Sequence, residues 1–143
     1  MKNKKVLIVS ARYYEDLSNS LELYASSSLN KIKHKIIKVP GVFEIPVVIS
    51  KNIKKFDGFI ALGVVIKGET PHFEFISQAT TNAIMQLSID HKKPVGNGII
   101  TCLTKKQAIA RGKKGSEAAK AIKSILSQKL WPSNIVPKIT QEL

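Results

Sequence analysis

The chain has 143 residues, of which 43% are hydrophobic and 23% are charged, and its formal net charge at pH 7 is +13. That length and apolar content suffice for one compact domain with its own core. No apolar stretch is long enough to cross a bilayer, and the short apolar run near the N-terminus is followed by Arg12 rather than by a signal-peptide cleavage site. We therefore expect a cytoplasmic protein that has no membrane contact.

The basic charge comes from 23 Lys and Arg against 10 Asp and Glu. Nucleic-acid-binding proteins have such a balance, so that class is an alternative. The basic residues are mostly scattered lysines, however, and the aromatic content of 6% is too low for a platform on which bases could stack. We expect a solvated, lysine-coated surface that attracts anionic substrates, and no nucleic-acid partner.

The single cysteine, Cys102, lies in the apolar run GIITCLT. One cysteine excludes an internal disulfide and argues against a thiolate metal site. We expect Cys102 to be a small buried hydrophobic residue rather than a nucleophile, and we expect no bound metal.

Four nearly unbroken, β-branched apolar segments predict strands that are buried on both faces: residues 5–11, 35–39, 58–66 and 95–103. Apolar residues at helical spacing predict helices over residues 17–29, 70–91 and 115–130, the first of them capped near Asp16 or Ser18. Residues 44–53 have strand-like propensity, but a parallel sheet requires a crossover at this point. We therefore expect a helix there, with Pro46 in its first turn.

These elements predict an α/β fold, a three-layer α/β/α sandwich around a four-stranded parallel sheet. A single domain would span residues 1–130. The tail over residues 131–143 contains two prolines, which argue against a further helix.

Ligands of such folds bind beyond the carboxyl ends of the strands. The segments that follow the predicted strands bring Tyr13, Phe43, Glu44, Thr70 and His72 to this edge. The two aromatic side chains could clamp a flat ring, or belong to the core. Glu44 could orient the polar edge of a ligand, or interact with the start of the following helix.

The stretch GETPHFEFI, residues 68–76, has the features of a helix start, because Thr70 suits the N-cap and Pro71 the first helical position. Free N–H groups at such a start bind anions, and without a Walker or GxGxxG pattern a small phosphorylated metabolite fits best. A capped helix without a ligand is the alternative. His72 in the first turn could transfer protons near pH 7, whereas we interpret His34 and His91 as surface residues.

Three segments resemble, in order and spacing, the signature segments of the 6,7-dimethyl-8-ribityllumazine synthase family: VPGVFEIP, ALGVVIKGETPHFEFI, and PVGNGIIT followed by QAIARG. The resemblance extends from about Val6 to Leu130. It implies a flavodoxin-like fold and a transferase of riboflavin biosynthesis that uses no cofactor or metal. The implied reaction condenses 5-amino-6-(D-ribitylamino)uracil with 3,4-dihydroxy-2-butanone 4-phosphate to 6,7-dimethyl-8-ribityllumazine, phosphate and water.

The resemblance also implies roles for individual residues. It makes His72 the catalytic residue that moves protons. It places the following residues at the pyrimidine and ribityl group: Tyr13, Val42, Phe43, Glu44, Val65, Ile66, Asn97 and Lys114. It places Gly68, Glu69, Thr70 and Arg111 at the phosphate.

The chain departs from the family pattern at two places. Many members have an aromatic residue where this chain has Asn97, so the ring would be sandwiched from one side. The segment ARGKKGSEAA is shorter than usual between the implied phosphate-binding Arg111 and Lys114, so Lys113 could replace Arg111 at the phosphate. Glu117 follows Lys114 by one helical turn and could pair with it.

The resemblance implies a homopentamer with sites shared between neighbouring subunits, and it leaves open a sixty-subunit shell and an association with riboflavin synthase. Asn97, Arg111 and Lys114 would then come from the neighbour. At the contacts between subunits we expect exposed apolar residues such as Ile45, Val48 and Ile99. A non-catalytic member that binds a lumazine or a flavin is a second alternative to the enzyme.

Overall fold

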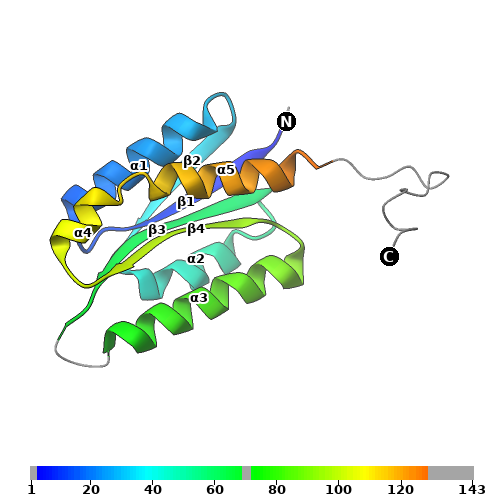
Figure 1. Cartoon of the computed structure of the whole chain (residues 1–143). Coiled ribbons are helices and arrows are strands. Elements are labelled where there is room, and N and C mark those ends of the chain that lie inside the picture. Colours follow the sequence, from blue (N-terminus) through cyan, green and yellow to red (C-terminus); the bar gives the residue numbers. More distant parts are fainter. Residues whose placement is uncertain (1–2, 69–71, 129–143) are drawn as a thin grey trace, which may run out of the picture.

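The computed structural model describes residues 3–68 and 72–128, in which strands and helices alternate (Figure 1). The elements are β1 (Lys5–Ala11), α1 (Glu15–Leu29), β2 (Lys33–Val39), the 3-10 turn η1 (Val42–Glu44), α2 (Ile45–Lys51), β3 (Gly58–Ile66), α3 (His72–His91), β4 (Val95–Cys102), α4 (Lys105–Ala110) and α5 (Lys114–Leu126). The strands of this described part form one four-stranded parallel sheet in the order β2-β1-β3-β4. Helices α1, α4 and α5 cover one face and α2 and α3 the other, which confirms the predicted three-layer, flavodoxin-like fold.

Two cores lie on opposite faces of the sheet, because successive side chains of a strand point to opposite sides. Val6 and Ile8 of β1 belong to the core formed with α1 and α5, whereas Leu7 and Val9 belong to the core formed with α2 and α3. All four side chains are completely buried. Burial on both faces explains why the central strands appear in the sequence as unbroken apolar runs.

The expected helix over residues 44–53 is present as α2, with Pro46 in its first turn. β2 begins at Lys33 rather than at residue 35, since this edge strand starts with exposed and half-buried residues that do not extend the apolar pattern. β4 ends at Cys102, whose side chain is buried as expected. None of the described helices is long and apolar enough to cross a membrane.

One expectation about a helix start was wrong, and one short helix was missed. Helix α1 begins at Glu15 without a side-chain cap, and the Ser18 hydroxyl instead lies 2.6 Å from the Ala11 carbonyl oxygen, to which it donates. The short helix α4 was not predicted, although Thr104 caps it by accepting a hydrogen bond from the Gln107 N–H at 3.2 Å. Six residues are too few for a clear apolar period. The predicted cap at Thr70 lies outside the described residues.

The expected exposure of Ile45 and Ile99 is also wrong, since their side chains are buried in the core on the α2 and α3 face, and Val48 is half-buried against it. A sheet covered on both faces needs these residues for packing. The large exposed apolar residues of α3 are instead Phe75, Met85 and Ile89.

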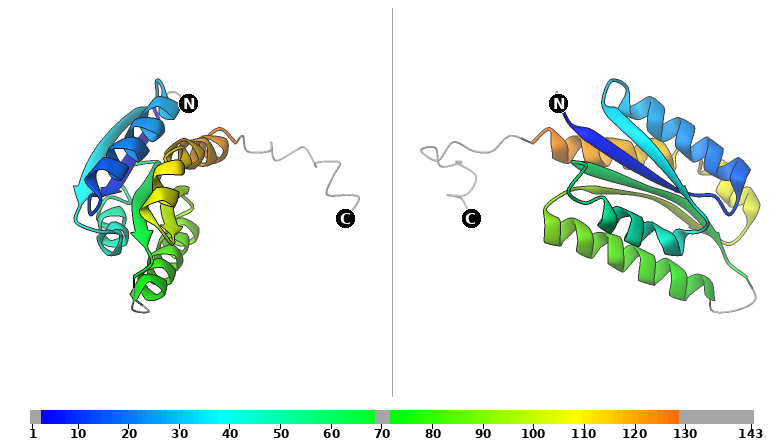
Figure 2. Two further views of the ribbon diagram at one scale, coloured as in Figure 1. Left: turned by 60° about the vertical axis from the view of Figure 1, so that its left-hand side comes forward. Right: turned by 180° about the vertical axis from the view of Figure 1, so that it is seen from behind.

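Helices α1 and α5 lie next to each other on one side of the sheet (Figure 2). They approach each other closely at Gly115, where an added Cβ atom would lie 2.2 Å from the backbone oxygen of Leu21. This contact is between backbones, so a side chain at residue 115 cannot be accommodated by a rotamer change.

We therefore expect Gly115→Ala to lower the free energy of unfolding by about 1–3 kcal/mol through overpacking, measured by urea denaturation. The matched control is Gly112→Ala, where the nearest atom is the Ser20 hydroxyl oxygen, which can rotate away. An equal effect of the two substitutions would contradict the close helix contact.

Candidate active site

A cavity of about 550 Å³ opens at the carboxyl edge of the sheet. Its described lining residues are Tyr13, Tyr14, Gly41, Val42, Phe43, Glu44, Val64, Val65, Ile66, Gly68, His72, Phe73 and Ile76. They follow β1 and β2, form the end of β3 and begin α3. The strand order reverses direction between β1 and β3, and open α/β sheets bind ligands at such a switch point.

Two aromatic side chains line this cavity without being packed into the core. Tyr13 is 76% exposed and Phe43 is 63% exposed, so both rings offer free faces. The Tyr13 ring contacts the Tyr14 ring edge-on, with 4.9 Å between the centroids. The interpretation of Tyr13 and Phe43 as core residues is therefore wrong. The other interpretation, that the two rings form a surface for a flat ligand ring, agrees with their exposure.

Tyr14 lines the cavity as well and was missed by the sequence analysis. Burial, and then the neighbouring Tyr13 and Cys102, raise the pKa of the Tyr14 phenol above its ordinary value of 10.0. The hydroxyl is therefore neutral at pH 7 and can donate a hydrogen bond. Its position directly after Tyr13, at the same strand end, is the signal that could have identified it.

Glu44 closes the turn that follows β2. Its Oε1 atom accepts a hydrogen bond from the Gly41 N–H at 2.9 Å, and its own N–H donates to the Gly41 carbonyl oxygen at 3.2 Å. These reciprocal bonds hold η1 in place, as the helix-start interpretation predicts. The other carboxylate oxygen, Oε2, forms no hydrogen bond with a described residue, so it can accept one from a ligand.

His72 is the first residue of α3 and lines the cavity. The positive end of the helix dipole lies at this position. Phe73 directly follows His72, Ile76 lies one turn further along the same helix, and both contribute to the apolar wall. The spacing of four residues between His72 and Ile76 is a sequence signal that could have identified Ile76. Glu69 and Thr70 lie outside the described residues, whereas Gly68 lines the cavity.

A second cavity of about 460 Å³ lies beside β4 at the edge of the sheet. It is lined by Ile99, Ile100, Thr101, Ala110, Arg111, Lys113, Lys114 and Glu117. The Arg111 guanidinium donates to the Thr101 carbonyl oxygen at 3.2 Å. Lys114 forms the expected ion pair with Glu117 at 3.7 Å, and both side chains are substantially exposed.

The structure thus brings only some of the candidate residues together. Eight of them share the first cavity: Tyr13, Val42, Phe43, Glu44, Val65, Ile66, Gly68 and His72. Arg111 and Lys114 line the second cavity instead. Asn97 lines neither; it is exposed on the edge strand β4, and its side-chain oxygen accepts a hydrogen bond from the Ile99 N–H at 3.0 Å.

Charge differs between the two cavities. Among the described residues, the first cavity contains Glu44 and no lysine or arginine, whereas the second contains three basic residues and one carboxylate. A phosphorylated ligand in the first cavity would therefore lack a fixed cationic partner within these residues. Within the described part of the chain, no cluster of His, Cys, Asp and Glu could hold a metal ion.

Comparison with known proteins assigns this arrangement to a family. Residues 3–129 match the family model of 6,7-dimethyl-8-ribityllumazine synthase. The chain is 42% identical to 6,7-dimethyl-8-ribityllumazine synthase 1 of Rhodopseudomonas palustris, over 85% of this chain and 83% of the relative. It is 42% identical to the synthase of Bartonella henselae over 90% of both chains, and 36% identical to that of Agrobacterium fabrum over 90% of this chain and 97% of the relative. With its parallel sheet and the cavity at its switch point, the chain belongs to the 6,7-dimethyl-8-ribityllumazine synthase family.

Proposed function

We propose that this chain catalyses the condensation of 5-amino-6-(D-ribitylamino)uracil with 3,4-dihydroxy-2-butanone 4-phosphate. The products are 6,7-dimethyl-8-ribityllumazine, phosphate and water, formed in the cytoplasm as a step of riboflavin biosynthesis. Family membership supports the reaction. The structural observation that carries it is the cavity at the strand switch point, which combines exposed aromatic rings with His72.

The pyrimidine ring fits against the exposed rings of Tyr13 and Phe43. Val65 and Ile66, at the end of β3, supply apolar floor to the same cavity. Glu44 can accept a hydrogen bond from a ring N–H or a ribityl hydroxyl through Oε2, while Oε1 stays bonded to Gly41. This combination holds a flat, polar-edged heterocycle in one orientation.

The reaction requires several proton transfers but no external electron source. The substrate amine attacks the ketone and loses water to form an imine. Elimination of the phosphate then gives an enol that rearranges to a new ketone, and the second amine attacks this carbonyl carbon and loses water to close the ring. We assign these transfers to His72, since it lies in the cavity and imidazole accepts and donates protons near pH 7. Most of the acceleration would come from holding two intrinsically reactive groups together.

The phosphate would lie near Gly68, together with the neighbouring Glu69 and Thr70. A dianion still needs a cation, and the described lining of the first cavity contains none. We propose that Arg111, supported by Lys113, comes from a neighbouring subunit that places its second cavity against the first. Asn97 and Lys114 would then approach the ring and ribityl group from that neighbour.

Such head-to-tail contacts close into a ring, and we propose a homopentamer as the smallest active unit. The exposed Phe75, Met85 and Ile89 on α3 supply apolar area for contacts between subunits. Assembly of pentamers into a sixty-subunit shell, and association with riboflavin synthase, are further outcomes that sizing of the purified protein would reveal.

The direct test is to mix the purified protein with both substrates and follow the absorbance and fluorescence of the lumazine product. We expect formation well above the slow uncatalysed reaction, without added metal or cofactor. A rate equal to the uncatalysed one, combined with tight binding of the lumazine or of a flavin, would instead support a non-catalytic binding protein.

We expect His72→Ala to lower the turnover number by about 10²-fold or more, because a general acid and base is removed, while the uncatalysed reaction sets the lower limit. The matched control is His34→Ala, since His34 lies at the start of β2, where its ring nitrogen contacts the Ile32 carbonyl oxygen. Retention of the full rate and of its pH dependence in His72→Ala would exclude the proposed proton transfer.

A further inference from the structure

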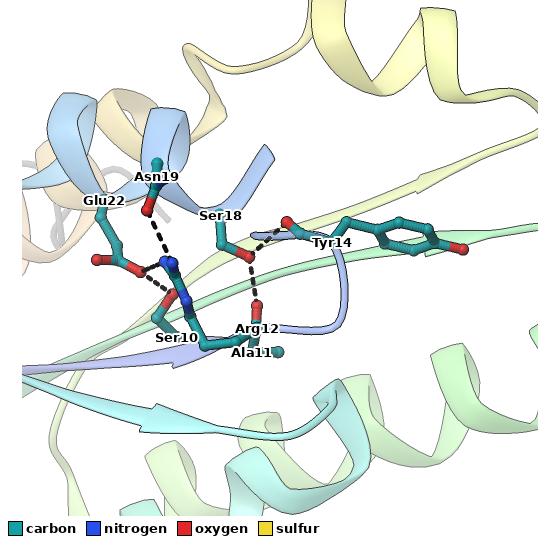
Figure 3. A network of polar contacts seen from close by, with 7 residues as sticks. All are labelled: Ser10, Ala11, Arg12, Tyr14, Ser18, Asn19 and Glu22. Carbon is teal, nitrogen blue, oxygen red and sulfur yellow. Dashed lines mark hydrogen bonds and ion pairs between the residues drawn. The ribbon is translucent and has the colours of Figure 1, made fainter. Parts of the chain in front are cut away.

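A polar network lies at the end of β1, beside Tyr14, which lines the first cavity (Figure 3). The Arg12 guanidinium forms an ion pair with Oε2 of Glu22 through Nη1 and donates from Nη2 to the Asn19 side-chain oxygen at 2.8 Å. The Ser10 hydroxyl donates to the same Glu22 oxygen at 2.6 Å. Four side chains thus join the end of β1 to helix α1.

The network is largely removed from solvent. The Arg12 and Glu22 side chains are 17% and 13% exposed, and Ser10 is completely buried. Burying an ion pair costs desolvation energy that its attraction often only offsets, so a gain in stability is a weak explanation for it. The directional, two-pronged geometry of the guanidinium instead fixes the position of the backbone that carries it.

Further contacts fix the backbone on both sides of Tyr13. The Arg12 N–H donates to the Val39 carbonyl oxygen at 2.8 Å, which extends the pairing of β1 with β2. Ser18, 1% exposed, has its hydroxyl 2.6 Å from the Ala11 carbonyl oxygen and 3.0 Å from that of Tyr14. The loop is therefore attached to β2 and to α1 within a few residues.

The Tyr13 ring itself contributes little to its own placement, because it is 76% exposed. The Tyr13 ring contacts the edge of the Tyr14 ring. The Tyr14 ring points away from the network (Figure 3). The position of the Tyr13 ring therefore depends on the backbone that Arg12 and Ser18 hold, whereas the Tyr14 ring also packs against the core beside α1 and α5. Loosening this backbone would change the ring surface and leave the rest of the cavity intact.

We propose that Arg12 and Glu22 form a positioning pair that sets the Tyr13 and Tyr14 rings for the heterocyclic substrate. Neither side chain lines the cavity. The pair therefore acts through the loop, and its loss would weaken binding of the pyrimidine more than binding of the butanone phosphate. This inference rests on the proposed function for its kinetic part.

The test compares Arg12→Met with the double variant Arg12→Met/Glu22→Gln. The single variant leaves a buried carboxylate without its cation and should lower the unfolding temperature. The double variant removes both charges, while the amide oxygen introduced by Glu22→Gln still accepts from Ser10, so most of the stability should return. We expect KM for the pyrimidine to rise about tenfold or more in both variants, with a less than about threefold change in KM for the butanone phosphate.

The matched control is Lys93→Met. Lys93 donates to the Ile53 carbonyl oxygen at 2.6 Å, so its removal also breaks a cationic contact between two segments. This contact precedes β3 and β4, at the edge of the sheet opposite the cavity. This control should leave both KM values unchanged. A pyrimidine KM that returns to normal when stability returns in the double variant would overturn the proposal, and so would an equal rise for both substrates.

A readout without substrate keeps the inference separate from the proposed function. The sequence contains three tyrosines, so 3-fluorotyrosine labelling gives three fluorine NMR resonances. The resonance of Tyr24, on α1, serves as the reference. We expect the Tyr13 and Tyr14 resonances to shift in the double variant while that of Tyr24 stays in place. Unchanged Tyr13 and Tyr14 resonances would overturn the positioning role even if the wild-type protein lacked synthase activity.

Discussion

The pairing of β1 with β2 on one side and with β3 on the other is the constraint on which the rest of the structure depends. Because both neighbours are parallel to β1, the chain leaves β1 and β3 at the same edge of the sheet and crosses to different sides. The loops after these strands separate there, and the space between them is the cavity that contains Tyr13 and His72. The position of the site thus follows from strand order, and its chemistry from the few residues that succeed each strand.

Apolar periodicity was sufficient to predict the layers and the edge of the sheet that carries the site, since Val6 to Val9 and Phe59 to Leu62 must be buried on both faces. It was not sufficient for α4, which is too short to show a period, or for the exposure of Ile99, which depends on packing by α3. The contact of Arg12 with Glu22 was also beyond prediction, because it depends on the angle at which α1 crosses β1. Local patterns determine elements, whereas side-chain pairs across elements require three-dimensional geometry.

The separation of aromatic and basic residues has a physical consequence for the proposed reaction. A carboxylate, two tyrosines and a histidine line one cavity, and the basic residues line another at the edge strand β4. In the proposed shared site, Arg111 and Lys113 of a neighbouring subunit would supply the cation that the described lining of the first cavity lacks. The ion pair of Lys114 with Glu117 is exposed and weak, so Lys114 could exchange it for a contact across the proposed interface.

The most direct test of the proposed shared site mixes two variants of low activity, His72→Ala and the double variant Arg111→Ala/Lys113→Ala, by unfolding and refolding them together. In rings formed at equal amounts, about one quarter of the interfaces would join an intact first cavity to an intact second one. We expect the mixture to recover about that fraction of the wild-type activity, well above either variant refolded alone. A mixture that is no more active than the average of its two components would contradict the account and show that each subunit contains a complete site.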